Sequence, residues 1–393
     1  MNTTTIDFKK QNSLVRLAKV SHMKVKLPRQ KFLDALAATA SLTGGRTTKP
    51  IFNCVKLTAA DNCVRVSATD GEAALCMCVE SILNEQDGET VLAADKLLNI
   101  VREMTDVEIS LEAADQYCVI RGEGSEFKIY VSDPADFPPM PEFAGDPDVI
   151  LDGRRLKRAV TLTLYAAAKE TNRYAINGVL WEKKGKSVFL IATDGRRLAR
   201  ASCPVVGGDA KDFEVIIPSK ALSVLERVFS PVEGQESWTI DIRVQPNQVL
   251  MRSGKDVLAT ALVEGHFPNY HDVIPKETNK SAKLDREAFY GAVRRASLLT
   301  TEDTRTVRLS FERGQLTMQS RAPEQGEARV TLPVDYEGDP IEIGFNPLYL
   351  QDPLRVIDFD QVIFKMSESA RPGILRGEDA ADFLYVVMPV ALS

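Results

Sequence analysis

The chain has 393 residues, of which 44% are hydrophobic and 26% are charged, and its formal net charge is −6. This composition is typical of a globular protein, and no apolar run approaches the ~20 residues of a membrane span, so disordered and membrane-spanning classes are excluded. Six cysteines without CxxC spacing and three histidines without metal-ligand spacing favour buried thiols in a reducing cytoplasm over disulfides or a metal site.

Residues 1–22 form the first segment, which we expect to be an N-terminal extension. It contains several basic residues but neither a continuous apolar core nor a small-residue cleavage site, which argues against a secretory signal. A transit-peptide-like composition remains an alternative.

The first structural unit is expected at residues 23–148. A helical pattern runs from Gln30 to Thr43, and the strand-like runs that follow are interrupted by Thr69-Asp70-Gly71. An Asp-Gly pair between two such runs predicts a β-hairpin, because these residues accept the positive φ of a tight turn. Lys96 then opens a second helical pattern after an apolar run.

The second unit, expected at residues 149–280, repeats these features. Its first helical pattern runs from Arg154 to Tyr165 and has apolar residues at the spacing of one buried stripe. Thr193-Asp194-Gly195 follows Thr69-Asp70-Gly71 by 124 residues, and Lys220 follows Lys96 by the same distance.

The third unit, expected at residues 281–393, is a fainter copy. Its helical pattern runs from Arg286 to Thr300, and Ser320–Glu324 replaces the Asp-Gly turn. A repeat of this length indicates whole domains. Two helices and several antiparallel strands in each unit predict an α+β fold of three repeated domains, with helices on one face of the sheets.

Basic residues gather on the predicted helices although the chain is acidic overall. Each of the three units contributes some of them: Lys31, Lys96, Arg102, Arg154, Arg155, Lys157, Arg158, Lys220, Arg227, Arg286, Arg294 and Arg295. A basic stripe on an acidic protein is typical of a polyanion-binding surface. The alternative is a solvated helix face that is balanced by neighbouring carboxylates.

Catalytic and cofactor patterns are missing from the sequence. There is no GxSxG, P-loop or dinucleotide-binding glycine motif. Asp70 and Asp194 are explained as turn residues. We therefore expect a non-enzyme without cofactor or metal, either a protein that binds a polyanion through its basic helices or a repeat scaffold that binds proteins and no DNA.

Seven stretches of the sequence, in order, resemble the bacterial DNA polymerase III beta subunit, the replicative sliding clamp. They are Gly44–Ile51, Ala135–Pro138, Arg173–Gly178, Ala192–Ala199, Phe267–Lys276, Ile343–Asn346 and Tyr385–Val390. The resemblance implies a head-to-tail homodimer in which two chains form a six-domain ring. Such a ring encircles double-stranded DNA without reading its sequence, and it confers processivity on the replicative polymerase in the cytoplasm.

The resemblance also implies two kinds of binding site. The residues expected to contact DNA are Arg46, Lys96, Arg173, Tyr174 and Lys220. Polymerase, clamp loader and repair proteins would insert short peptides into a pocket between domains 2 and 3, lined by Ile176, Thr193, Gly195, Arg197, Leu198, Pro268, Val273, Val386, Met388, Pro389, Val390 and Leu392. The alternative for the apolar members of this set is ordinary core packing.

The dimer seam implied by the resemblance pairs Phe127 and Ile129 of one chain with Leu298 and Leu299 of the other. Three positions depart from the family pattern: Arg196 replaces a usual His or Tyr, Asp272 replaces a basic residue of some members, and Ala391 replaces a common Arg. These departures bear on peptide preference rather than on the existence of the pocket.

Overall fold

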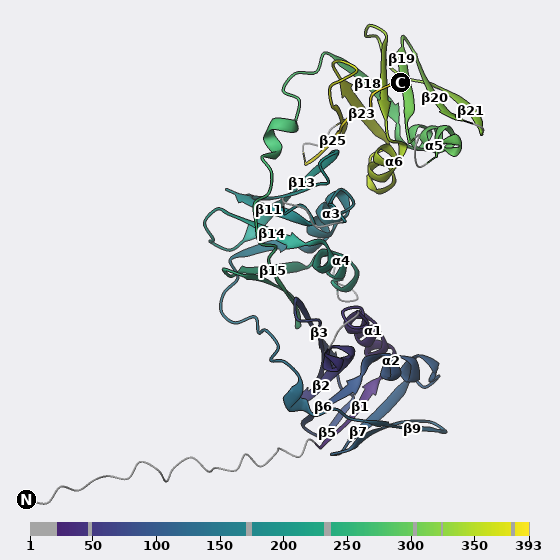
Figure 1. Cartoon of the computed structure of the whole chain (residues 1–393). Coiled ribbons are helices and arrows are strands. Elements are labelled where there is room, and N and C mark those ends of the chain that lie inside the picture. Colours follow the sequence, from purple (N-terminus) through teal and green to yellow (C-terminus); the bar gives the residue numbers. More distant parts are fainter. Residues whose placement is uncertain are drawn as a thin grey trace, which may run out of the picture. The chain divides into compact units, whose positions relative to one another are not determined.

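The computed structural model describes residues 22–45, 49–169, 175–231, 237–301, 305–323, 325–378 and 382–392. It divides into two compact units, residues 1–140 and 141–393. Helices and antiparallel strands alternate through both units, and Figure 1 shows the elements with their labels.

Within its described residues, the first compact unit contains two α-helices and two sets of paired strands. One sheet has the strand order β5-β1-β7-β8-β9, and β2 pairs with both β3 and β6 in the other, where β3 also pairs with β4. Its elements are β1 (Met23–Pro28), α1 (Arg29–Ala40), β2 (Cys54–Ala60), β3 (Cys63–Thr69), β4 (Ala73–Glu80), β5 (Leu83–Gln86), β6 (Gly88–Ala93), α2 (Ala94–Glu103), β7 (Glu108–Ala113), β8 (Tyr117–Gly122) and β9 (Ser125–Tyr130).

The core of this unit lies between the sheets and the paired helices. Helices α1 and α2 pack against each other, and the apolar side of α1 buries Phe32 and Leu36. Helix α2 buries Leu97 and Val101 and leaves Lys96 exposed. The expected amphipathic helices are therefore present, and the basic side chain of Lys96 is directed away from the core.

One cysteine expectation is wrong. Cys63 on β3 and Cys78 on β4 form a disulfide, whereas Cys54, Cys118 and Cys203 are buried free thiols, as predicted. Antiparallel pairing of β3 with β4 brings the two side chains together, since Cys63 lies diagonally opposite Cys78 in the register. The spacing of cysteines along the sequence does not show this proximity.

The second compact unit begins with a second copy of the helix-and-strand pattern. Helices α3 and α4 pack against each other on one side of its strands (Figure 1). Its elements are β10 (Val149–Asp152), α3 (Gly153–Leu164), β11 (Gly178–Lys184), β12 (Ser187–Thr193), β13 (Arg197–Gly207), β14 (Phe213–Pro218), α4 (Ser219–Val228), β15 (Thr239–Val244), β16 (Gln248–Ser253) and β17 (Asp256–Ala261).

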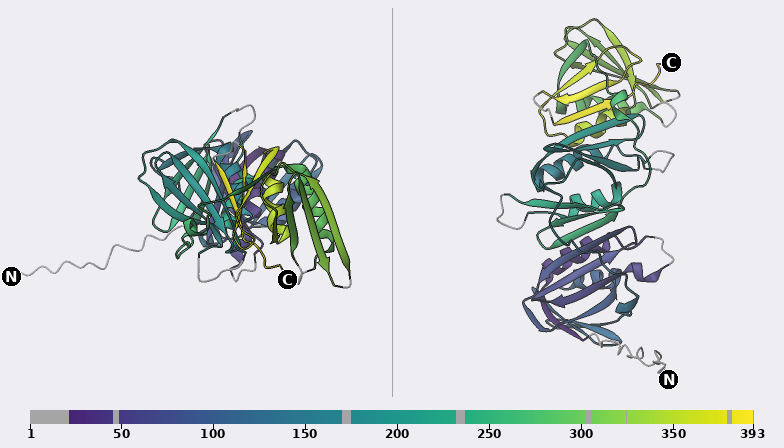
Figure 2. Two further views of the ribbon diagram at one scale, coloured as in Figure 1. Left: turned by 90° about the horizontal axis from the view of Figure 1, so that it is seen from above. Right: turned by 90° about the vertical axis from the view of Figure 1, so that its left-hand side faces the viewer.

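A third copy completes this unit. Helices α5 and α6 form its pair, and Figure 2 shows the long hairpin of β20 and β21 in green. Its elements are β18 (Lys280–Asp285), α5 (Arg286–Ala296), β19 (Val307–Glu312), β20 (Gln315–Ala322), β21 (Gly326–Pro333), β22 (Ile341–Phe345), α6 (Pro347–Val356), β23 (Gln361–Met366), β24 (Gly373–Gly377) and β25 (Phe383–Val387). The α+β architecture of three similar domains is thus as predicted.

Strand β13 joins the second and third copies into one sheet. Its first half pairs with β12 on one side and with β25 on the other, so the strand order runs β14-β11-β12-β13-β25-β24-β23-β18. The central strands are buried, with Leu198, Ala199 and Tyr385 almost inaccessible to solvent. This continuous sheet fixes the third copy against the second and forms the base of the candidate site.

Candidate functional site

The two Asp-Gly turns have the same geometry. In the second turn, the Thr193 hydroxyl donates to the Arg197 carbonyl (2.7 Å) and accepts from the Gly195 N–H (3.1 Å), while the Asp194 carboxylate accepts from the Arg196 N–H (2.9 Å). Gly195 has a φ of +84°, which glycine adopts without strain. The sequence prediction of a tight hairpin is confirmed here and at Gly71, whose φ is +95°.

The side chain of Arg197, the residue that follows this turn, contacts the third copy of the fold. Its guanidinium donates to Asp194 (3.0 Å), to Asp352 of α6 (2.7 Å) and to the Tyr165 carbonyl (2.9 Å), and it lies 4.6 Å from the ring centre of Tyr349. The side chain is only 10% exposed. Burial by itself would lower the pKa of Arg197, but its anionic neighbours raise that pKa above the ordinary value, so the cation is permanent.

A cavity of about 150 Å³ opens beside this arginine. Nine of the twelve predicted pocket residues line it, together with two that were not predicted, Asn269 and Tyr270. We call it the anchor pocket, and its lining residues are Ile176, Thr193, Gly195, Arg197, Leu198, Pro268, Asn269, Tyr270, Val273, Val386 and Met388. These residues come from β12, β13 and the turn between them, from the end of β25, and from the segments before β11 and before β18, which meet where the second and third copies join.

The chemistry of the anchor pocket suits an apolar side chain. Ile176, Leu198 and Val386 are buried in its wall, whereas Val273 and Met388 are exposed at its edge. The Tyr270 hydroxyl points away to donate to Glu182 (2.9 Å), so the tyrosine contributes mainly its ring. Small apolar cavities with a few fixed polar groups are typical binding sites, and a flexible methionine at the rim adapts to different occupants.

Three predicted pocket residues, Pro389, Val390 and Leu392, do not line the cavity. They belong to the C-terminal tail, which docks beside it. The Met388 N–H donates to the Arg196 carbonyl (2.9 Å), and the Val390 N–H donates to the Gly344 carbonyl (2.8 Å). The tail is therefore held across β22, and Val390 and Leu392 remain partly exposed next to the pocket. Arg196 and Asp272, which depart from the family pattern, are exposed and do not line it either.

The structure describes two of the five residues that are predicted to contact DNA. Lys96 and Lys220 are exposed in the first turns of α2 and α4, as expected. Arg46, Arg173 and Tyr174 lie outside the described residues. A cation near a helix start is opposed by the helix dipole, so both lysines occupy positions that stability alone does not favour.

Two basic residues of α3 have a structural role, which corrects part of the predicted basic stripe. Arg158 forms ion pairs with Asp358 (2.9 Å) and Asp382 (2.6 Å), and Lys157 donates to the Phe229 carbonyl (2.8 Å). Because Asp358 and Asp382 belong to the third copy, Arg158 ties this copy to the second. Arg154 and Arg155, by contrast, are exposed.

The four predicted seam residues lie near sheet edges. Phe127 and Ile129 are on β9, the last strand of its sheet, and Leu298 and Leu299 follow α5 in a short 3-10 turn that packs on the edge strand β21. Leu298 is 77% exposed and Phe127 is 36% exposed, so neither side chain is part of the buried core. Ordinary core packing therefore does not explain these two residues.

Neither a metal-binding cluster nor a membrane-spanning helix is present within the described ranges. There, no group of three or more His, Cys, Asp or Glu side chains is arranged to hold a metal ion. None of the helices in those ranges combines the length and the apolar character that crossing a bilayer requires.

Comparison with known proteins covers the chain from residue 23 nearly to its end. The N-terminal, central and C-terminal domain models of the DNA polymerase III beta subunit match residues 23–141, 150–269 and 271–391. The beta sliding clamp of Pseudomonas putida is 31% identical over 367 residues, covering 93% of this chain and 99% of that protein. The beta sliding clamp of Escherichia coli is 30% identical over 371 residues, covering 94% and 100%.

Solved structures of sliding clamps are also similar to this chain. A DnaN sliding clamp from Pseudomonas aeruginosa, crystallised with griselimycin, superposes with a TM-score of 0.87 at 30% identity, covering 94% of this chain and 100% of that one. The sliding clamp of Bacillus subtilis shares the fold with a TM-score of 0.88 at 24% identity, over 95% and 100% of the two chains. The chain therefore belongs to the bacterial DNA polymerase III beta subunit family, the beta sliding clamps.

Proposed function

We propose that two copies of this chain close into a ring around duplex DNA and hold the replicative polymerase through the anchor pocket. As a member of its family, the chain is a non-catalytic sliding clamp of DNA polymerase III. The match to all three family domains is the single observation that carries this conclusion. Because bacterial replication takes place in the cytoplasm, we expect the protein to act there.

The exposed basic residues support DNA binding without sequence recognition. Lys96, Lys220, Arg154 and Arg155 are long cationic side chains on or at the start of rigid helices. Contacts of lysine and arginine with phosphates position DNA but do not read bases, and a sliding ring needs this kind of contact. The net charge of −6 disfavours DNA binding elsewhere on the protein.

The exposed apolar residues at two sheet edges support the dimer. Strand β9 ends one sheet and β21 ends another, and each edge offers backbone groups that a second strand would pair with. We propose that β9 of one chain meets β21 of its partner, with Phe127 and Ile129 packing on the partner's Leu298 and Leu299. Two seams of this kind, related by a two-fold axis, close a ring.

The anchor pocket supports recruitment of partners. Its apolar lining and the polar groups of Thr193 and Arg197 suit a short peptide with a large apolar side chain. We propose that polymerase, clamp loader and repair proteins each present such a peptide. Different partners then compete for one site on each chain.

Topology provides the test of the ring. Protein loaded onto nicked circular plasmid with the organism's clamp loader and ATP is separated from free protein by gel filtration, and the plasmid is then linearised. A ring stays with the circle and is lost from the linear DNA. Equal retention on both forms would contradict encirclement, and no retention on either would favour a scaffold that binds proteins and no DNA.

A further inference from the structure

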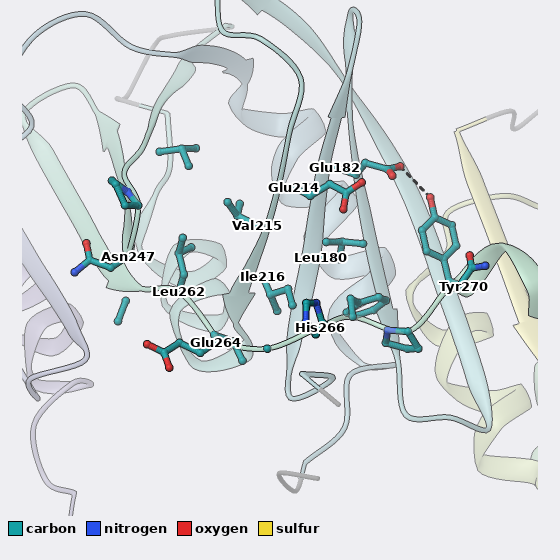
Figure 3. A pocket seen from close by; sticks show the side chains of 18 of the residues that line it. Leu180, Glu182, Glu214, Val215, Ile216, Asn247, Leu262, Glu264, His266 and Tyr270 are labelled. Carbon is teal, nitrogen blue, oxygen red and sulfur yellow. Dashed lines mark hydrogen bonds between the residues drawn. The ribbon is translucent and has the colours of Figure 1, made fainter. Parts of the chain in front are cut away.

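A second, larger hollow borders the anchor pocket. Its volume is about 1140 Å³, and it shares Pro268, Asn269 and Tyr270 with the anchor pocket, so the two are separated only by this short segment. Figure 3 shows Val215 and Ile216 of β14, with Leu262 and Asn247 across from them. We call this hollow the acidic groove, because its lining, as far as the described residues show it, contains three glutamates, Glu182, Glu214 and Glu264, against one lysine, Lys184, and two histidines.

Two of the three glutamates are exposed, although Glu214 is also the cross-strand neighbour of Glu182 and interacts with its side chain. Glu182 is buried and already has partners, since Lys184 lies 2.6 Å from one of its oxygens and Tyr270 donates to the other. Burial disfavours its ionised form, but Lys184 and Tyr270, with a smaller contribution from Glu214, outweigh burial and lower the pKa of Glu182 below its ordinary value, so it is ionised at neutral pH. Glu214 and Glu264 are exposed at the groove.

The wall of the groove is the edge of a sheet. Among the described strands, β14 pairs only with β11. On its other side the Ile216 carbonyl accepts from the Val263 N–H (2.9 Å), and the preceding residues Glu214 and Val215 line the groove. An edge strand inside a groove is suited to an extended peptide, which adds backbone hydrogen bonds along the edge.

We propose that the acidic groove receives a lysine- or arginine-rich flank of the partner peptide whose apolar side chain occupies the anchor pocket. This inference rests on the proposed function of the anchor pocket. Continuity through Pro268–Tyr270 lets one extended chain reach both cavities, and Glu214 and Glu264 select basic over acidic flanks. The groove thereby ranks partners that carry similar apolar anchors.

Labelled synthetic peptides test this proposal. Each has a central Leu-Phe anchor in a serine background, with four lysines, four glutamates or four serines placed on its N-terminal or C-terminal side. Fluorescence anisotropy gives Kd on the full chain, on the Glu214→Gln/Glu264→Gln double variant and on a control, Glu312→Gln/Glu368→Gln, which changes the net charge equally. All four positions are exposed, so the folds should be preserved.

We expect lysines on one side of the anchor to tighten binding about fivefold over serines, because each of two exposed charge contacts contributes modestly. The double variant should remove this gain and leave Kd of the serine peptide unchanged, whereas the control pair should keep the gain. A benzophenone in the lysine flank should crosslink to residues 213–216 or 261–266.

Two results would overturn the inference alone: no gain from lysines on either side, or an equal gain on the double variant, which would indicate only the net charge of the chain. The anchor itself is checked with Met388→Ala, which should weaken all peptides alike. If no anchored peptide binds the full chain, the proposed function of the anchor pocket fails, and the inference fails with it.

Discussion

Replacement of Arg197 by alanine should destabilise the junction between the second and third copies of the fold. The guanidinium is 10% exposed and forms ion pairs at 3.0 Å and 2.7 Å with Asp194 and Asp352, which are themselves only 19% and 24% exposed. Removing one partner of a buried ion pair typically costs ~3–5 kcal/mol, because the remaining charge is left without compensation. Partial exposure of the two carboxylates places the expected loss near the lower limit, about 3 kcal/mol.

Intrinsic tryptophan fluorescence measures this loss selectively. Both tryptophans of the chain, Trp181 and Trp238, lie in the second compact unit and are at most 7% exposed. For a unit of this size, 3 kcal/mol corresponds to a decrease in Tm of roughly 6–12 °C. The adjacent Arg196→Ala is the matched control, since the Arg196 side chain is exposed, and it should shift Tm by less than about 2 °C.

A double-mutant cycle with Asp352→Ala assigns the effect to the ion pair. The two single substitutions should be strongly non-additive, with a coupling of about 1–3 kcal/mol. The predicted role of the ion pair is refuted if Arg197→Ala is no more destabilising than Arg196→Ala. It is refuted as well if the effects of Arg197→Ala and Asp352→Ala on the free energy of unfolding are additive. Either result would mean that the sheet between β13 and β25 holds the junction without this network.

Four further predictions follow from other contacts. Gly153→Ala should destabilise the second unit by about 2 kcal/mol or more, because its Cβ would lie 2.4 Å from the Trp238 ring. Gly45→Ala in the first unit, where no described atom lies within 4 Å of the added Cβ, should be nearly neutral, and differential scanning calorimetry, which reports on both units, compares the two variants. The hydrogen bond from Arg158 lowers the pKa of Asp358 below its ordinary value of 3.8, so the ion pair stabilises the fold above that pH. This stabilisation is lost as the pH falls through the pKa of the folded state. Asp358→Asn should therefore flatten the decrease of Tm between about pH 5 and pH 2.5, whereas the control Asp360→Asn should leave that decrease unchanged. Phe127→Glu should convert dimer to monomer in sedimentation, with Val107→Glu, also an exposed apolar position of the first unit, as a neutral control; a dimer that persists would refute the proposed seam. Lys96→Ala and Lys220→Ala should each reduce the slope of log K for DNA against log salt by about one, and unchanged slopes would show that neither lysine contacts phosphate.

Much of the fold was accessible from the sequence because the chain repeats itself. The two Thr-Asp-Gly turns lie 124 residues apart and have the same hydrogen bonds, so one local prediction applied twice. Helical periodicity placed α1, α3 and α5 within a few residues of their observed bounds. The diagonal contact of Cys63 with Cys78 was missed because it depends on strand register, which neither residue spacing nor composition reveals.

The site was predicted in part for a similar reason. Residues such as Leu198 and Val386 belong to recognisable stretches, and β-pairing of β13 with β25 brings them together. Tyr270 lies in one of those stretches, but the sequence does not show that its ring lines the anchor pocket while its hydroxyl donates to Glu182. The sequence predicts Arg158 to be part of the basic stripe, because its carboxylate partners, Asp358 and Asp382, lie about 200 residues away along the chain.

If two chains close into a ring, the molar mass of the protein in solution must be that of a dimer. Light scattering coupled to size-exclusion chromatography at micromolar concentration should give twice the chain mass of 43.4 kDa. A dimer would support the enclosed hole that the proposed function requires. A mass equal to that of one chain would contradict encirclement of DNA and would leave only the anchor pocket to explain how the protein works.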